Sequence, residues 1–194
     1  MNEETPKRKR LLSSAYHLFT TKGINHTTIQ DIVDAAKVAK GTFYLYFEDK
    51  YHIQEELIID KSKELFNAAL EELRNHKIKK FDDQIIFIID YVIDEIIKTP
   101  DILNFITKDL ALGIYNDKIT MLLDTESLGL KSMFLKGIKD NKIKLKNPEI
   151  TLFMIIEFVS STLYSVVTNK INTDIKEYKS YIHKIIKNMI NGGY

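Results

Sequence analysis

Residues 27–50 read TTIQDIVDAAKVAKGTFYLYFEDK, the most specific pattern in the chain. A first short helix is expected from Thr27, where Thr27 and Gln30 are spaced as a capping box. A second is expected between Val38 and Phe47. Helices this short do not persist alone, so packing against the preceding helix must hold them. The apolar residues available for that contact are Ile32, Val33, Ala36, Val38, Phe43 and Phe47.

A turn of three or four residues separates these two short helices. This is the geometry of a helix-turn-helix unit, in which the second helix presents its first residues to the DNA major groove. Lys40, Gly41 and Thr42 form the first turn of that second helix. Free backbone N–H groups and the positive end of the helix dipole favour a phosphate there, and glycine permits its close approach.

This stretch resembles the tetracycline-repressor (TetR) family of bacterial transcriptional regulators. The resemblance rests on residues 38–47, VAKGTFYLYF, followed by Lys50. Upstream it includes Thr27, Thr28, Ile32, Ala35 and Ala36. Lys37 stands where the family usually has the turn glycine, and Ala39 where many members carry a capping serine. A lysine held at positive φ costs about 1 kcal/mol, so the turn either stores that strain or closes differently.

The resemblance implies a set of DNA contacts. Threonine and tyrosine hydroxyls would donate to phosphate oxygens, lysines would supply charge, and Thr42 and Leu45 would lie nearest the base edges. The implied residues are Thr27, Thr28, Lys40, Gly41, Thr42, Tyr44, Leu45, Tyr46 and Lys50. For Tyr44 and Tyr46 the alternative is packing in the core. The basic run at residues 7–10 is either a solvated surface or a further phosphate contact.

The remaining sequence predicts helix nearly throughout, so we expect an all-α fold of about nine helices. Only 7 Gly and 3 Pro occur, and isoleucine falls on helical stripes such as Ile85, Ile88, Ile89, Val92, Ile93 and Ile96. The helices are expected at residues 5–22, from 27, 38–47, 49–74, 81–98, 101–112, 117–140, from 147, and from 174 to 191. Asn141 is expected to adopt a left-handed cap.

Two domains follow from this organisation and from the resemblance. Residues 1–50 would form the three-helix DNA-binding domain, and residues 51–194 a helical domain for effector binding and dimerisation. The formal net charge is +1, with eight basic and six acidic residues in the first fifty. So small an excess of positive charge requires two copies of the chain to bind DNA together. Their two reading helices would face major grooves about 34 Å apart, or a multiple of that, on an inverted repeat.

The two last long helices offer a surface for this homodimer. Around the expected helix from residue 147, one face is aliphatic, and the other carries Phe153, Glu157, Ser160, Ser161 and Tyr164. A helix of this kind is covered on both sides, by its own domain and by a partner. The last helix adds Tyr178, Tyr181, Ile182, Ile185, Ile186 and Met189. The family likewise pairs through a four-helix bundle. The alternative is a large monomeric helical core.

The middle helices are expected to enclose a pocket for an unidentified small-molecule effector. Aromatic and methionine stripes also form ordinary cores, so both interpretations stay open. The candidate lining residues are Phe87, Tyr91, Phe105, Tyr115, Met121, Met133, Phe134, Glu157, Phe158 and Tyr164. A carboxylate among apolar neighbours is costly unless paired. Glu157 therefore meets a cationic effector, crosses the dimer seam to a hydroxyl or lysine, or extends to water.

Other functions lack residues to support them. There are no cysteines, so disulfides and thiolate chemistry are excluded, and a reducing cytoplasm fits. The histidines do not follow metal-ligand spacing, and Asp83, Asp90 and Asp94 are expected to form a solvated stripe. We therefore predict a cytoplasmic regulator of double-stranded operator DNA, most simply a repressor, with no enzyme activity, cofactor, metal or membrane span. The alternatives are an all-helical carrier or enzyme with a purely structural N-terminal bundle, and a DNA-binding protein without an effector.

Overall fold

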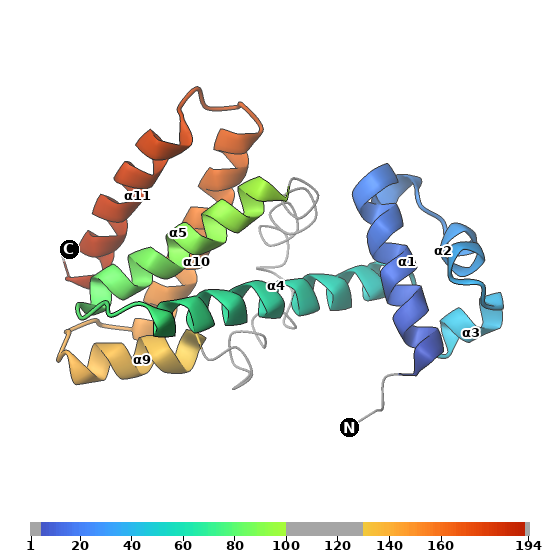
Figure 1. Cartoon of the computed structure of the whole chain (residues 1–194), viewed down its shortest axis with the longest axis horizontal. Helices are drawn as coiled ribbons and strands as arrows, with labels where there is room; N and C mark the ends of the chain where they lie inside the picture. The colour runs from blue at the N-terminus through green and yellow to red at the C-terminus, as the bar shows by residue number, and fades with distance from the viewer. Residues whose placement is uncertain (1–4, 100–129, 193–194) are drawn as a thin grey trace. The chain divides into compact units, whose positions relative to one another are not determined.

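The computed structural model of the protein describes residues 5–99 and 130–192 (Figure 1). Within these ranges every regular element is a helix: eight α-helices and one short 3-10 turn. The all-α prediction is therefore confirmed. The chain divides into two compact units between Lys61 and Ser62, inside the long helix α4 (Lys50–Asn75).

Unit 1, up to Lys61, contains α1 (Pro6–Lys22), a 3-10 turn η1 (Ile24–His26), α2 (Ile29–Ala36), α3 (Lys40–Tyr44) and the start of α4. Thr5 caps α1 and Asp49 caps α4 with its side-chain oxygen. Long α1 supplies the packing surface that two such short helices need. The fully buried centre consists of Leu11, Ala15, Ile32, Phe43 and Ile53, with Val33 and Phe47 almost fully buried.

The capping box of α2 differs from the prediction by one residue. Thr28, not Thr27, is the N-cap: its backbone N–H donates to Asp31 Oδ2 at 2.9 Å, and Asp31 N–H donates to Thr28 Oγ1 at 3.1 Å. These bonds lower the pKa of the Asp31 carboxyl, because they stabilise its charged form. The Thr27–Gln30 prediction was wrong because the Thr27 side chain is buried and its hydroxyl donates to Gly23 O.

Unit 2 contains the rest of α4, α5 (Phe81–Lys98), α9 (Leu130–Asp140), α10 (Pro148–Val167) and α11 (Ile175–Ile190). Asn147 and Asp174 cap α10 and α11, while the helix expected at 101–112 and the start of that at 117–140 lie outside the described residues. After α9 the left-handed residue is Lys142, with φ 54°, and not Asn141. Asn141 N–H still donates to Gly137 O, so the last turn continues one residue further than predicted.

The core of unit 2 is built mainly from α5, α10 and α11. Fully buried side chains include Ile93, Leu163, Ile182 and Ile186, and the rings of Phe81 and Phe134 lie 5.7 Å apart. By length and composition α10 could cross a membrane. Its buried side, however, belongs to this core, and buried helices of soluble proteins have the same composition.

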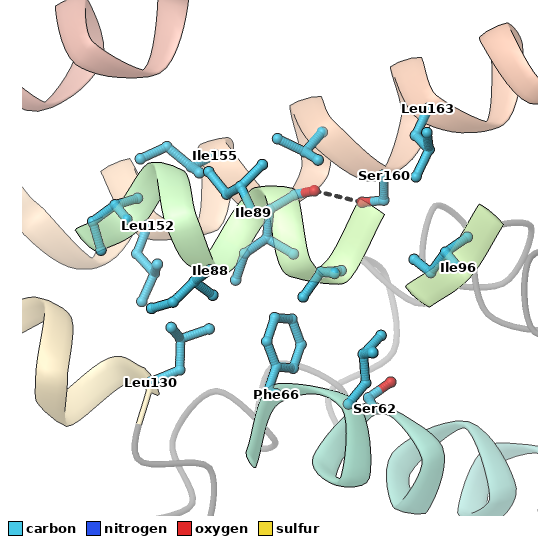
Figure 2. A pocket seen from close by; sticks show the side chains of 15 residues that line it. Ser62, Phe66, Ile88, Ile89, Ile96, Leu130, Leu152, Ile155, Ser160 and Leu163 are labelled. Atoms are coloured by element: carbon cyan, nitrogen blue, oxygen red, sulfur yellow. Dashed lines mark hydrogen bonds between the residues drawn. The ribbon is translucent and has the colours of Figure 1, made fainter. Parts of the chain in front are cut away.

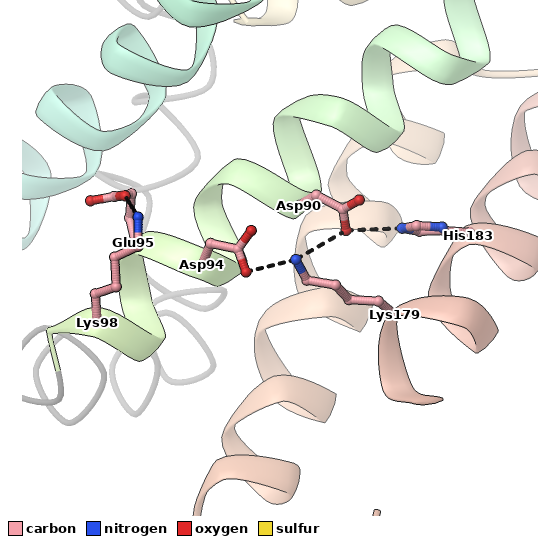
Figure 3. A network of polar contacts seen from close by, with 6 residues as sticks. All are labelled: Asp90, Asp94, Glu95, Lys98, Lys179 and His183. Carbon is pink, nitrogen blue, oxygen red and sulfur yellow. Dashed lines mark hydrogen bonds and ion pairs between the residues drawn. The ribbon is translucent and has the colours of Figure 1, made fainter. Parts of the chain in front are cut away.

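A polar seam joins α5 to α11, and Figure 3 shows its central part. His183 Nε2 lies 2.9 Å from Asp90 Oδ1, and Lys179 Nζ donates to Asp94 Oδ1 at 2.7 Å. Near the start of α5, Lys187 Nζ donates to Asp83 at 2.6 Å, which lowers the pKa of Asp83 and raises that of Lys187. The predicted solvated stripe is thus a set of interhelical contacts. Exposed pairs contribute little stability, so the seam mainly fixes the register of two helices.

Candidate nucleic-acid interface and ligand cavity

The connection between α2 and α3 is a turn of three residues, 37–39. Lys37 has φ 54° and ψ 51°, and its N–H points back to the carbonyls of Val33 and Asp34. Val38 N–H donates to Val33 O at 3.0 Å. The turn therefore closes in the left-handed conformation that a glycine adopts freely, and stores about 1 kcal/mol of strain.

α3 exposes a surface that unit 1 does not use for its own packing. We call Lys40, Gly41, Tyr44 and Leu45 the α3 surface. Leu45 is 78% exposed and Tyr44 54%, whereas Phe43 beside them is fully buried. Tyr44 is therefore not a core aromatic. A Cβ atom added at Gly41 would meet nothing within 4 Å, so the fold itself does not require a glycine there.

Two of the predicted DNA contacts are occupied inside unit 1. Thr27 is fully buried and its hydroxyl donates to Gly23 O at 2.9 Å. Its hydroxyl is therefore not available to a phosphate. Half-buried Lys50 donates from Nζ to Ile24 O at 2.8 Å and to Thr27 O at 3.1 Å. A lysine ammonium has three donors, so these bonds position the Lys50 charge and leave one N–H.

The other predicted residues differ in exposure. Thr28 is exposed but also caps α2, and Thr42 is half-buried. The Tyr46 hydroxyl lies 2.7 Å from Thr5 Oγ1, so it ties α1 to the segment after α3. Sequence reasoning missed Tyr51, a half-exposed aromatic whose ring centroid lies 5.5 Å from Lys50 Nζ. Its position next to Lys50 in the first turn of α4 was the available signal.

The basic run at residues 7–10 is not uniform. Arg8 forms an ion pair with Glu56 and lies 5.6 Å from the centroid of the Phe47 ring. Lys7 and Arg10 are exposed. Arg8 therefore joins α1 to α4 within unit 1, and its exposed neighbours remain candidates for phosphate contact.

Unit 2 holds a cavity of about 70 Å³ bordered by α4, α5, α9 and α10 (Figure 2). The side chains around it are leucine, isoleucine, valine and phenylalanine, apart from Ser62 and Ser160. Within residues 5–99 and 130–192, no ionisable side chain lines it. The α5 part is the isoleucine stripe identified in the sequence, including Ile85, Ile89 and Ile96.

This cavity is not lined by any of the described residues predicted for the effector pocket. Phe134 is in the core, Phe87 stacks on His76 at 4.7 Å, and Phe158 lies at a groove between α10 and α11. Tyr91 and Met133 pack against the cluster of Ala69, Leu70, Ile88 and Leu130, and Tyr164 contacts Lys170. Phe105, Tyr115 and Met121 lie outside the described residues. Phe87, Tyr91, Phe158 and Tyr164 are each adjacent in sequence to a residue that lines the cavity, so they lie on a neighbouring face of the same helix, and their role in effector binding stays a prediction.

Glu157 is half-buried on α10 and does not line the cavity. Desolvation raises the pKa of its carboxyl to about 7. This pKa lies above its unfolded value, so the stabilising contribution is complete at low pH and lost as pH rises through 7. Glu157→Gln, which stays neutral, should therefore gain stability over wild type between pH 5 and 8.5. After allowing for solvent screening we expect about 1–2 kcal/mol.

Urea denaturation at the two pH values measures this change. A Glu157→Gln effect of equal size at both pH values would contradict the shifted pKa.

Unit 2 also exposes apolar side chains on α10 and α11. They include Met154 on α10 and Tyr181, which is 61% exposed, and Ile185 on α11. Together with Phe158, Tyr181 and Ile185 border a shallow groove between the two helices. Exposed apolar patches of this kind are typical of protein–protein contact surfaces.

Comparisons with known proteins agree with the helix-turn-helix geometry. Residues 11–57 match the family model described as bacterial regulatory proteins of the tetR family. The chain is 33% identical over 73 residues to YuxN, an uncharacterized HTH-type transcriptional regulator of Bacillus subtilis, covering 38% of this chain and 24% of that protein. It spans about a quarter or less of the length of the first curated relatives that it matches.

Solved structures share the fold over nearly the whole chain. A TetR-family transcriptional regulator from Syntrophomonas wolfei superposes with a TM-score of 0.71 and 22% identity, covering 98% of this chain and 96% of that one. FadR of Bacillus subtilis, in complex with stearoyl-CoA, gives a TM-score of 0.63 and 18% identity, covering 95% and 98%. At these identities the likeness is one of fold.

Proposed function

The N-terminal part of the chain belongs to the tetR family of bacterial regulatory proteins, and on this premise we propose that the protein is a cytoplasmic, homodimeric, DNA-binding transcriptional repressor. A small-molecule effector releases it from an inverted-repeat operator. The observation that carries the proposal is the α3 surface. Lys40, Tyr44 and Leu45 are exposed on a helix held by a three-residue turn from α2.

The chemistry of this surface suits the DNA major groove. Lys40 supplies charge for phosphate, Tyr44 a hydroxyl donor, and Leu45 an apolar contact for a thymine methyl group. Gly41 leaves room for the DNA backbone, since nothing in unit 1 occupies the space beside its Cα. Thr28 and Lys50 contribute as positioned groups at the edges of this site. The Thr27 hydroxyl is not part of this site, because it donates to Gly23 O within unit 1.

Dimerisation uses the exposed apolar side of α10 and α11. Met154, Tyr181 and Ile185 have apolar area that unit 2 leaves in water. Pairing two copies covers that area and also doubles the modest positive charge presented to DNA. Glu157, half-buried on α10, then lies at or near the interface between the two copies.

The effector site is the apolar cavity of unit 2. FadR, which shares this fold, is a complex with stearoyl-CoA, so a unit of this architecture can hold an apolar chain. Here α4 is one continuous helix, with Lys50 at its start in unit 1 and Ser62 and Phe66 at the cavity. An effector that favours one position of α4 by roughly 1–3 kcal/mol would change operator affinity about 5- to 150-fold.

Operator binding tests the proposal through Lys40 and Leu45. Lys40→Ala should weaken binding to all duplexes and reduce the salt dependence by about one unit per half-site, because one phosphate contact is lost. Leu45→Ala should relax the sequence preference at one base pair, at a cost of about 1–3 kcal/mol. Mobility shifts on DNA flanking the protein's own gene, at several salt concentrations, measure both effects.

Lys139→Ala is the matched control, because Lys139 is also exposed but lies on α9 of unit 2. It should bind as wild type. If the protein shows no salt-dependent duplex binding, the DNA-binding proposal fails, and the all-helical carrier becomes the better account. If Lys40→Ala and Lys139→Ala behave alike, the α3 surface is not the interface.

A further inference from the structure

The cavity of unit 2 contains one polar group without a partner. The Ser62 hydroxyl is buried, and no hydrogen-bond partner for it exists among the described residues. Ser160, the other hydroxyl at the cavity, donates to the carbonyl of Ile156 (Figure 2). A buried hydroxyl left unpaired is costly, so Ser62 marks the position where a hydrogen-bonding atom is missing.

Water does not fill this role well. A buried water needs 2–4 polar partners, and among the described residues at the cavity wall Ser62 has the single free hydroxyl. The volume of about 70 Å³ is several times the roughly 10–15 Å³ that a cavity needs to hold one water. The cavity is therefore too large and too apolar for a satisfied water. An apolar molecule with one polar atom matches it.

The side chains that line the cavity also determine which charge a bound ligand can carry. The described residues around the cavity are aliphatic side chains, a phenylalanine and two serines, and none of them is a cation or anion that could pair with a charged ligand. Transfer of an unpaired carboxylate or ammonium into such a site is strongly unfavourable.

We propose that the cavity binds an uncharged aliphatic molecule or segment whose single hydrogen-bonding group pairs with the Ser62 hydroxyl. This inference gives the chemical class of the effector and rests on the proposed function of the cavity. Ser62 is on α4, so the hydrogen bond would link ligand occupancy to the helix that starts at Lys50.

The probes for the test are 1-hexanol, n-hexane, hexanoate and hexylammonium, each titrated into the full-length protein without DNA. Methyl NMR shifts of the isoleucine residues, six of which line the cavity, report binding. We expect 1-hexanol to bind, and both charged analogues to bind at least tenfold more weakly. The cavity site is overturned if neither neutral probe shifts the lining methyl groups.

Two serine variants test the hydrogen bond. Ser62→Ala should weaken 1-hexanol about two- to tenfold, the effect of one hydrogen bond, and should bind n-hexane no more weakly than wild type. Ser160→Ala, which removes a hydroxyl already paired with Ile156, should leave the preference for 1-hexanol over n-hexane unchanged. Equal losses in both variants, or charged analogues that match 1-hexanol, would overturn the inference.

The same titrations repeated with operator DNA separate this inference from the proposed function. Binding of 1-hexanol with the Ser62 signature but without any change in DNA affinity would support the ligand class and refute the effector role. A protein that binds DNA but none of the neutral probes would refute the ligand class and leave the DNA-binding proposal standing.

Discussion

A chain carrying Tyr181→Glu and Ile185→Glu is expected to be monomeric at micromolar concentration and to lose about 100-fold or more in operator affinity. Both side chains are exposed on one side of α11, where we place the dimer seam. Two carboxylates per copy, facing the same residues of the partner, would repel and would be desolvated in the seam. Analytical ultracentrifugation and mobility shifts measure the two effects.

The matched control is Lys176→Glu with Ser180→Glu. These two positions are exposed on a different side of α11, beside His183. This control should remain dimeric and bind DNA as wild type. If both double variants stay dimeric, the dimer does not form through Tyr181 and Ile185, and our placement of the dimer interface is wrong.

Gly137→Ala is expected to destabilise unit 2 by about 1–3 kcal/mol, the usual cost of overpacking a core. A Cβ atom at this position of α9 would overlap the ring of Phe81, which is itself buried against Phe134. Either the ring or α9 must shift. Thermal unfolding followed by circular dichroism should show a midpoint lower by about 2–4 °C per kcal/mol.

Gly41→Ala is the control for Gly137→Ala, since Gly41 is also helical but has open space beside it. Alanine there should keep or slightly raise stability, because it is the better helix former. Adding Phe81→Leu to Gly137→Ala should restore part of the loss. If the changes in stability caused by Phe81→Leu and Gly137→Ala were simply additive, the predicted contact between the Cβ atom and the Phe81 ring would be contradicted.

Much of the fold could be predicted from sequence because its signals are local. Side-chain caps at Thr5, Asn147 and Asp174 and the period of the apolar residues placed most helix ends within a residue or two. The errors also have local causes. The α2 cap moved from Thr27 to Thr28 because adjacent threonines have the same capping chemistry, and only burial of Thr27 distinguishes them.

The cavity and the polar seam could not be predicted in the same way, because they depend on contacts between distant helices. Residue type favoured aromatic side chains for the pocket, but the cavity lies against the isoleucine stripe of α5. Asp90 pairs with His183, which is 93 positions away in the chain, so no local pattern showed that it was partnered. By contrast, the α3 surface comes from one short contiguous motif, residues 40–45.

The central claim is that two copies present their α3 surfaces to one inverted repeat. The most direct measurement selects duplexes from a random pool with the full-length protein, then determines the mass of the complex on the selected DNA. We predict two chains per duplex and a two-fold symmetric site, with binding lost when about five base pairs, half a helical turn, separate the half-sites further. One chain per duplex, unaffected by that insertion, or no enriched sequence at all, would contradict the account.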